Sequence, residues 1–386
     1  MKCLSTKATS IKPSGIRKFF DLASTMEGVI SLGVGEPDFA TPWHICENAI
    51  HYMSTGHTHY TANRGLLELR EEICKFHKEH YNQVYDPENE VIVTIGGSEA
   101  IDLCMRALLN PGDEVIVLDP NYVAYAPSVI LSDGVVVPLK LKEENDFKIL
   151  PEDLKKVITP KTKAMIINYP SNPTGGVMTK EDYAKIIDII KESGIYVISD
   201  EIYAELSFDQ PFASLAQFDE IKSQIIVVNG FSKAYAMTGW RLGYCMANKE
   251  LSSVMNKIHQ YVIMSAPVMS QYAGIEAIKN GYDDVLMMKD DYLKRRNFLV
   301  NRLNRMGLKT NMPHGTFYVF CNIQSTGLDS ETFCERLLQE QKVACVPGNA
   351  FGDSGEGYVR ISYAYSIDHI KEAIVRLEQF LKDLEN

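Results

Sequence analysis

Five short apolar runs constrain the fold of this chain more than any other feature. They occupy residues 91–94, 114–118, 164–168, 195–199 and 225–228. Runs this short and this apolar are typical of strands buried on both faces of a sheet. Patterns typical of amphipathic helices occupy residues 98–109, 180–193 and 249–263. The alternation predicts an α/β fold, with a parallel or mixed sheet between two layers of helices.

The pattern changes near residue 284. One amphipathic stretch, with its charges on the outer face, runs to Gly307 and predicts a single long helix. Short strands are expected at residues 316–320 and 358–362, and helices from about Ser330 and Ile367. The expected division is an N-terminal arm and part of the small domain (1–40), a large domain (41–283) and a small C-terminal domain (284–386).

The composition excludes several classes of partner. The 386-residue chain has a formal charge of −11, which disfavours nucleic acid and anionic membrane surfaces. No run approaches the roughly 18 apolar residues that a membrane span needs, and the first residues lack the apolar segment of a secretory signal. The eight cysteines include no CxxC pair, so we expect free thiols and a cytoplasmic protein.

A lysine lies just beyond the last apolar run, in the segment GFSKAYAMTGWRLGY (230–244). If that run is a strand, Lys233 lies at its carboxyl end, where open α/β folds bind ligands. Its amine is then suited to form a Schiff base with a carbonyl. The alternative, more common for this residue type, is a solvated lysine beside a turn. Arg241 offers a permanently charged fork that suits a phosphate.

Two further turns at predicted strand ends are candidate ligand sites. The GGSEA segment (96–100) opens a helix, and free N–H groups at Gly97 and Ser98 would attract a phosphate. The alternative is a tight turn with Ser98 as the helix N-cap. The NYPSNPTG segment (168–175) places Asn172 between two prolines that fix the backbone. We favour a ligand-binding role for Asn172 over an ordinary proline-rich turn.

Two charged residues lie at or within predicted strands. Asp200 ends the fourth strand, where an unpaired carboxylate is costly and a protonated ring nitrogen would stabilise it. The alternative is a carboxylate that caps the next helix. Tyr203 would lie on the same side, one turn later, if the chain becomes helical there. Arg360, in GYVRISY, should face a carboxylate that belongs either to a ligand or to a structural salt bridge.

Other motifs give no functional site. Gly33 and Gly35 lack the third glycine and the strand–helix context of a dinucleotide fingerprint. His77 and His80 are expected on a charged helix face and lack the HExxH spacing. No cluster has the spacing of metal ligands, so we expect no metal site.

Seven of these segments, taken together, resemble the class I/II aminotransferases, enzymes of fold type I that depend on pyridoxal 5'-phosphate (PLP). The resemblance covers nearly the whole chain and is closest to the aspartate/aromatic subgroup of bacteria and archaea. It implies a large domain with a mostly parallel seven-stranded sheet between helices, and a smaller α/β domain. The segments are SLGVGEPDF (31–39), HYTANRGLLELRE (59–71), GGSEA (96–100), NYPSNPTGG (168–176), SDEIY (199–203), GFSKAYAMTGWRLGY (230–244) and GYVRISYA (357–364).

The resemblance implies the catalytic residues by motif. Lys233 should hold the cofactor as a Schiff base and move the proton between substrate and cofactor. Asp200 should pair with the protonated pyridine nitrogen. Tyr203 and Asn172 should hydrogen-bond the phenolic oxygen of the ring, and Tyr122 should stack on the ring.

The resemblance also implies how the cofactor phosphate is held. Arg241, the backbone of Gly97 and Ser98, and the Ser98 hydroxyl should bind it. The chain departs from many family members at Gly230, where they have a serine. We expect Ser232 to supply that contact, or the contact to be missing.

Substrate binding and assembly follow from the same resemblance. Arg360 should bind the substrate α-carboxylate, with the Gly35 backbone assisting and Asn172 beside it. Tyr60 matches a tyrosine that reaches the phosphate of the neighbouring subunit. The resemblance therefore implies a homodimer with shared active sites.

The expected reaction moves an amino group from an L-amino acid to a 2-oxo acid, with 2-oxoglutarate as the expected acceptor. Some aspartate-preferring relatives have a lysine at the position of Ser98, so we favour a neutral or aromatic donor over aspartate. The nearest alternative is a PLP-dependent carbon–sulfur β-lyase. A remote alternative is a PLP-binding regulatory protein, which the acidic charge and the early start of the motifs disfavour.

Overall fold

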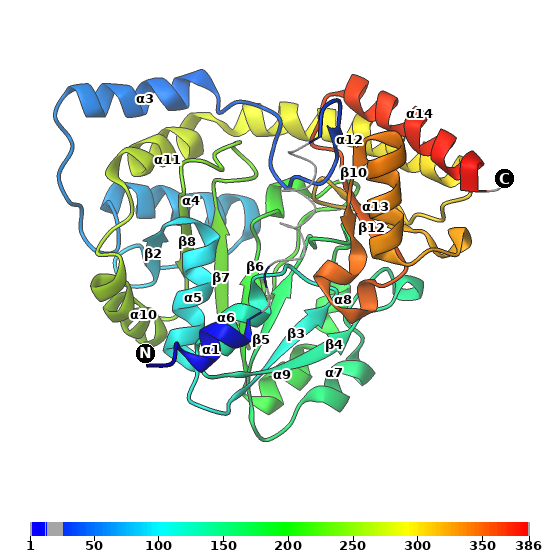
Figure 1. Cartoon of the computed structure of the whole chain (residues 1–386). Helices are drawn as coiled ribbons and strands as arrows, with labels where there is room; N and C mark the ends of the chain where they lie inside the picture. The colour runs from blue at the N-terminus through cyan, green and yellow to red at the C-terminus, as the bar shows by residue number, and fades with distance from the viewer. Residues whose placement is uncertain (1, 12, 14–25, 385–386) are drawn as a thin grey trace.

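A seven-stranded sheet forms the centre of the computed structural model, which describes residues 2–11, 13 and 26–384 (Figure 1). The strand order is β2-β8-β7-β6-β5-β3-β4. Neighbouring strands run parallel except where β8 pairs with β2 and with β7. The strands are β2 Val91–Thr94, β3 Glu114–Asp119, β4 Val135–Lys140, β5 Thr162–Asn168, β6 Tyr196–Asp200, β7 Ile225–Gly230 and β8 Gly243–Met246.

Five of these seven strands coincide with the predicted apolar runs, within one or two residues at each end. The two strands that were not predicted have no such run. β4 is an edge strand in which Val135, Pro138 and Lys140 are exposed. β8 begins with Gly243, at the end of the segment that carries Lys233.

Helices cover both faces of the sheet, as predicted. Alternate side chains of each buried strand enter two separate apolar clusters; in β7, for example, Ile225 and Val227 enter one and Ile226 and Val228 the other. One face is covered by α5 Gly96–Leu108, α6 Tyr125–Leu131 and α10 Lys249–Val262. The opposite face is covered by α3 Trp43–Ser54, α4 Leu67–Tyr81, α7 Pro151–Val157, α8 Lys180–Ala184, α9 Ile187–Ser193 and α11 Val268–Asn280.

Two details differ from the expectations. The helix predicted over 180–193 is broken into α8 and α9, because the N–H groups of Lys185 and Ile186 bond carbonyls only three residues back. His77 does not lie on a charged face. It is fully buried, and its ring nitrogens bond Gln83 (2.7 Å) and the Tyr244 hydroxyl (2.8 Å). Burial lowers the pKa of His77 to about 4, so the ring is a neutral link between α4 and β8.

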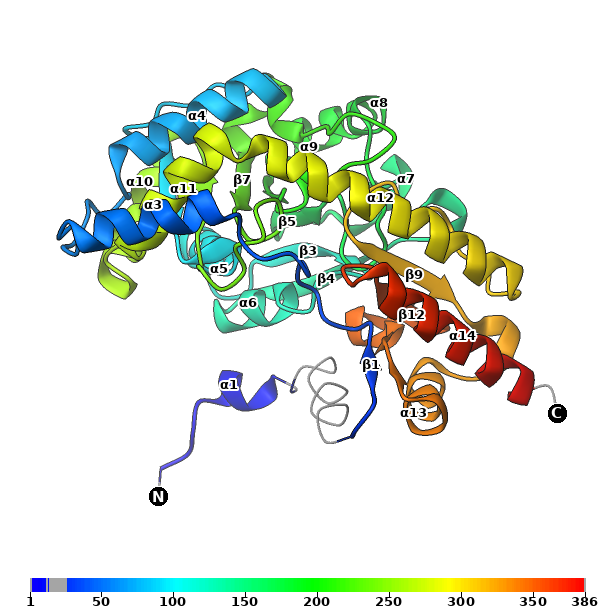
Figure 2. The ribbon, with the colours of Figure 1, turned by 90° about the horizontal axis from the view of Figure 1, so that it is seen from above.

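A second, three-stranded antiparallel sheet lies in the C-terminal part of the chain, with the order β11-β12-β9. The long helix α12 extends from the central sheet to this part (Figure 2). β1 pairs in parallel with β10, so a segment near the amino terminus lies beside the C-terminal part. The bounds are β1 Ile30–Ser31, β9 Tyr318–Asn322, β10 Val343–Ala344, β11 Val346–Pro347, β12 Tyr358–Ser362, α1 Thr6–Ser10, α12 Tyr282–Arg305, α13 Ser330–Gln341 and α14 Ile367–Leu384. Every helix within the described residues is too short or too polar to span a membrane.

Close backbone contact joins β8 to the start of α5. Gly243 pairs with Gly230 of β7 and packs against Gly96 and Gly97. A Cβ at Gly243 would lie 2.6 Å from the Gly96 carbonyl carbon and 2.7 Å from the Gly97 nitrogen. There is therefore no room for a side chain between the strand and the first turn of the helix.

We expect Gly243→Ala to lower the free energy of unfolding by about 1–3 kcal/mol, because the new methyl group must displace backbone atoms. Urea denaturation of the cofactor-free protein measures the change. Gly239→Ala is the matched control, since nothing lies within 4 Å of a Cβ at that position. Equal losses in the two variants would contradict the packing argument.

Candidate active site

A cavity of about 620 Å³ lies at the carboxyl ends of β5, β6 and β7 and extends to β9 and β12. Open parallel sheets bind ligands at this edge. Eleven of the twelve predicted site residues line it: Gly35, Gly97, Ser98, Tyr122, Asn172, Asp200, Tyr203, Ser232, Lys233, Arg241 and Arg360. Tyr60 does not line it and is 84% exposed.

Lys233 lies in the wall of the cavity rather than on the open surface. Its Nζ donates a hydrogen bond to the carbonyl oxygen of Gly35 (2.6 Å). Burial lowers the pKa of Lys233 to about 8, against the opposing effect of the Glu36 carboxylate. About a tenth of the amine is therefore unprotonated at pH 7, far more than for an ordinary lysine, and the unprotonated amine is the nucleophile.

Asp200 ends β6 as a buried carboxylate. One oxygen accepts a hydrogen bond from the Tyr125 hydroxyl (2.6 Å), and the other accepts one from the Ile202 N–H (3.2 Å). Burial raises the pKa of Asp200 to about 6, although both hydrogen bonds and the charge of Lys233 lower it. The capping alternative explains only the Ile202 contact. The carboxylate is suited to a cationic atom of a ligand.

Arg360 projects from β12 into the cavity. It donates from Nη1 to the Asn172 side-chain oxygen (2.8 Å) and from Nη2 to the Gly33 carbonyl (2.6 Å), while its buried Nε has no partner. The guanidinium carbon lies 4.2 Å from the centre of the Tyr318 ring and 4.8 Å from that of Phe351. No carboxylate in the described part of the chain forms an ion pair with it, so its charge is available to an anionic ligand.

The start of α5 and Arg241 form the opposite end of the cavity. α5 begins at Gly96 with Ile95 as its N-cap, so Ser98 lies within the first turn and is not the cap. Gly96 has φ +69°, and a Cβ there would lie 2.6 Å from Arg241 Nη2. The glycine thus lets the guanidinium approach N–H groups of the first turn, an arrangement that attracts an anion.

The departure from the family pattern at Gly230 has a structural cause. Gly230 of β7 is paired with Gly243 of the neighbouring strand β8. A Cβ at Gly230 would lie 2.9 Å from the Gly243 Cα and 2.9 Å from the Leu242 carbonyl oxygen. A serine does not fit there without movement of the backbone. Ser232, two residues later, is buried and lines the cavity.

Sequence reasoning missed three residues of the site. Asn168 donates to the Asp200 carbonyl (2.9 Å), and its side-chain oxygen accepts the Asn172 N–H (2.9 Å), which fixes both neighbours. Tyr125 follows Tyr122 by three residues, a spacing that would have placed both on one side of a helical turn. Tyr318 lies within the predicted strand 316–320 and begins the observed strand β9, and nothing in that pattern indicated a role in ligand binding.

The described residues contain no group of three histidine, cysteine, aspartate or glutamate side chains that is placed to hold a metal ion. The groups that line the cavity and can take part in chemistry include an amine, a carboxylate, several hydroxyl groups and two guanidinium groups.

Comparison with known proteins identifies the family. The model for "Aminotransferase class I and II" matches residues 27–377. The putative aminotransferase YugH of Bacillus subtilis is 50% identical over 98% of both chains, and the aromatic-amino-acid aminotransferase 2 of Thermococcus litoralis is 43% identical over 98% of both. The structure of the Thermus thermophilus aspartate aminotransferase with maleate superposes with a TM-score of 0.94, at 36% identity, over 98% of this chain and 100% of that one.

We expect Asp200→Asn to stabilise the cofactor-free protein. When folding raises the pKa of an acidic group, the folded protein loses stability as the pH rises from the unfolded pKa of that group, about 3.9 for aspartate, to its folded pKa. With a folded pKa of about 6, the full cost is present above pH 6. The variant should therefore exceed the wild type by roughly 1–3 kcal/mol at pH 8, and the difference should shrink between pH 6 and pH 4.

Urea unfolding between pH 4 and pH 8 tests this expectation. Asp102→Asn, on the exposed side of α5, removes the same charge from a surface ion pair and serves as the control. Equal stability of Asp200→Asn and the wild type at pH 8 would contradict the role of burial.

Proposed function

Since the chain belongs to the class I and II aminotransferase family, we propose that the cavity around Lys233 is its active site. The protein is a PLP-dependent enzyme that transfers an amino group from an amino acid to a 2-oxo acid. The observation that carries the proposed site is the convergence of an amine with a lowered pKa, a buried carboxylate and two guanidinium groups in one cavity.

The residues of the cavity fit PLP at three points. The first turn of α5 and Arg241 suit its phosphate, and Asp200 suits a protonated pyridine nitrogen. The Lys233 amine suits its aldehyde. When bound, PLP supplies the carbon that takes up the amino group and the ring that withdraws electrons from the substrate.

Each remaining wall residue has a proposed binding role. Tyr122 stacks on the ring, and Tyr203 and Asn172 hydrogen-bond the ring oxygen. The Gly97 and Ser98 N–H groups, the Ser98 hydroxyl and Ser232 share the phosphate with Arg241. These contacts fix the ring relative to the lysine, so that the reacting atoms meet in one geometry.

Lys233 is the proposed general base and acid. With a pKa of about 8, not far from neutral pH, Nζ can act first as a base toward the substrate α-carbon and then as an acid. The Gly35 carbonyl, 2.6 Å away, holds the amine in the cavity between these steps.

Arg360 is the proposed site of the substrate α-carboxylate. Its Nε has no protein partner, and Asn172 holds Nη1, so the fork is oriented before a ligand arrives. The backbone of Gly35 lies on the same side of the cavity and assists. A bidentate pair of this kind fixes the α-carbon relative to Lys233.

We propose a neutral or aromatic donor and 2-oxoglutarate as the acceptor. The cations that line the cavity among the described residues are Lys233, Arg241 and Arg360, and each already has a proposed role. Ser98 stands where some aspartate-preferring relatives carry a lysine, so this position offers no charge to a second carboxylate.

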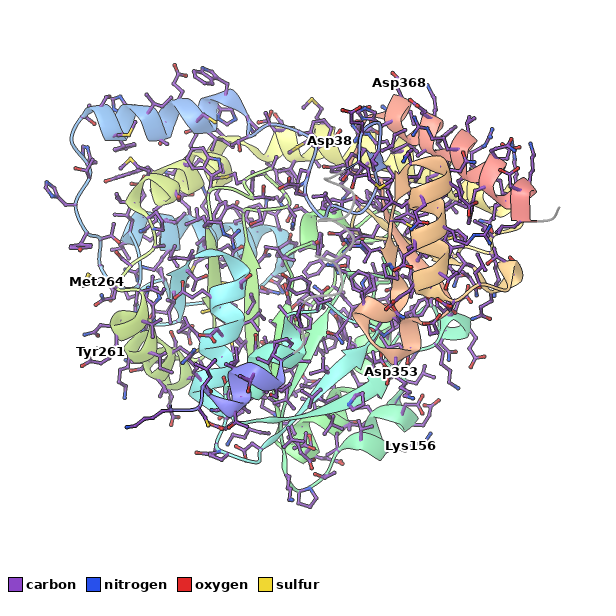
Figure 3. The ribbon with its side chains drawn as sticks, viewed as in Figure 1. Asp38, Lys156, Tyr261, Met264, Asp353 and Asp368 are labelled. Atoms are coloured by element: carbon purple, nitrogen blue, oxygen red, sulfur yellow. The ribbon has the colours of Figure 1, made fainter. Side chains whose placement is uncertain are left out.

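We propose that two copies of the chain form a homodimer in which Tyr60 reaches the partner's phosphate site. Tyr60 is 84% exposed, and Tyr261 (85%) and Met264 lie at the edge of the molecule (Figure 3). The Asn63 side chain donates to the Met264 carbonyl (2.8 Å), which joins the Tyr60 loop to this apolar edge. Sedimentation equilibrium should give twice the chain mass; a monomer at micromolar concentration would contradict the proposal.

We also propose a cytoplasmic location and the division into residues 1–40, 41–283 and 284–386. Most cysteines are buried free thiols, which suits a reducing compartment. Most apolar residues of α12, β9 and β12 belong to a second cluster, although Val285, Phe320 and Tyr358 join the cluster of the seven-stranded sheet. Cell fractionation tests the location, and native-state hydrogen exchange tests whether the domains open separately.

We expect Lys233→Ala to abolish turnover and leave the fold intact. Mixing the holoenzyme with single amino acids, without an acceptor, should convert its visible absorbance stoichiometrically in the wild type and not in the variant. Lys249→Ala, which removes an exposed lysine at the start of α10, is the control. Steady-state transamination by Lys233→Ala would overturn the assignment.

We expect Arg360→Ala to lower kcat/KM by about 30- to 1000-fold for every donor, because hydrogen bonds to a charged group are lost. Phenylalanine and aspartate should lose similar factors, since the α-carboxylate is common to both. The wild type should use phenylalanine faster than aspartate. A loss confined to one donor would place Arg360 at the substrate side chain instead.

A further inference from the structure

Tyr318 joins three parts of the proposed site. It begins β9, is 1% exposed and lines the cavity. Its hydroxyl lies 3.0 Å from that of Tyr203, and its ring lies 4.2 Å from the Arg360 guanidinium carbon. The hydroxyl also packs so closely on Gly35 that a Cβ there would collide with it.

Only one proton can lie between the two hydroxyl oxygens, so one tyrosine donates and the other accepts. The Arg360 charge against the Tyr318 ring withdraws electrons from that phenol and makes it the stronger donor. Burial raises the pKa of both tyrosines, and Arg360 opposes the rise for Tyr318 more directly than for Tyr203. Tyr318 therefore donates and Tyr203 accepts.

This direction leaves the proton of Tyr203 free to point into the cavity. A hydroxyl that accepts one hydrogen bond donates the next one more strongly. The charged groups that face Tyr203 are Arg360, Asp200 and Lys233, whose Nζ lies 6.0 Å from the ring centre. Of these, Arg360 acts on Tyr203 directly, and it can also act through the Tyr318 hydroxyl.

We propose that Tyr318 is a positioning residue that transmits the charge of Arg360 to the hydroxyl of Tyr203. When a substrate carboxylate pairs with Arg360, the electron-withdrawing effect of the Arg360 charge on the Tyr318 ring weakens. Tyr203 then becomes a weaker hydrogen-bond donor. Carboxylate binding thereby makes the hydrogen-bond acceptor in the cavity more basic, beside the amine that must move a proton. The inference rests on the proposed roles of Arg360 and Tyr203.

The test is a pH titration of the visible absorbance of the holoenzyme, in the wild type and in Tyr318→Phe. A strong donor at Tyr203 favours the deprotonated form of the absorbing group. Without the Tyr318 hydroxyl, the apparent pKa of the absorbing group should rise by about 0.5 unit. This is the order expected if a charge-assisted hydrogen bond from Tyr203 loses about 10–30% of its strength. A fall would mean that Tyr203 donates to Tyr318 in the wild type. A fall or an unchanged value overturns the inference.

A second titration, at saturating 3-phenylpropionate, tests the link to the substrate. This carboxylate has no amino group to transfer. It should raise the apparent pKa less in Tyr318→Phe than in the wild type, and equal displacements would overturn the inference.

Tyr363→Phe is the control, because it removes an equally buried hydroxyl that donates to the Thr316 carbonyl (2.9 Å) outside the cavity. It should behave as the wild type; a shift equal to that of Tyr318→Phe would show a structural effect alone and overturn the inference.

A difluorinated tyrosine at position 318 keeps the shape of the residue and makes its phenol more acidic. It should lower the apparent pKa, opposite to Tyr318→Phe, and it replaces that variant if Tyr318→Phe does not fold. No fall with the fluorinated residue overturns the inference. Absence of any visible band in the wild-type holoenzyme would instead overturn the proposed active site.

Discussion

The burial of charged groups that form no ion pair within the described residues is the constraint on which the proposed active site depends. Asp200 lies at the end of a strand inside the molecule, and Arg360 keeps one buried N–H unpaired. Each arrangement is costly unless a ligand completes it. The sheet and its helices hold both groups in place. Their unfavourable burial lowers the stability of the empty protein, and a ligand of complementary charge would relieve that cost when it binds.

Much of this architecture could be predicted from local sequence, and the failures have physical causes. The apolar runs identify strands that are buried on both faces, but β4 is half-exposed and β8 begins with Gly243, at the end of the segment that carries Lys233. His77 was placed on the surface because its neighbours are charged, whereas its partners Gln83 and Tyr244 come from other elements.

In the candidate site, too, the residues in distinctive local segments could be predicted, and those defined by contacts between distant segments could not. Lys233, Asp200 and Arg360 lie in segments that are distinctive in themselves, and the structure brings them into one cavity. Tyr318 begins an ordinary strand, and its contacts depend on the separate segments that carry Tyr203 and Arg360. Its position is a property of tertiary packing, which no local pattern records. The proposed role of Tyr60 requires a second copy of the chain, so the structure of a single chain does not display it.

The contacts of the N-terminal glycines have a consequence for the newly made chain. The Gly33 carbonyl accepts a hydrogen bond from Arg360, and the Gly35 carbonyl accepts one from Lys233. The first contact joins residues 327 positions apart. A ribosome must therefore reach residue 360 before the cavity can close. Until then the cavity lacks the Arg360 guanidinium, so a partly made chain holds only an incomplete site for an anion.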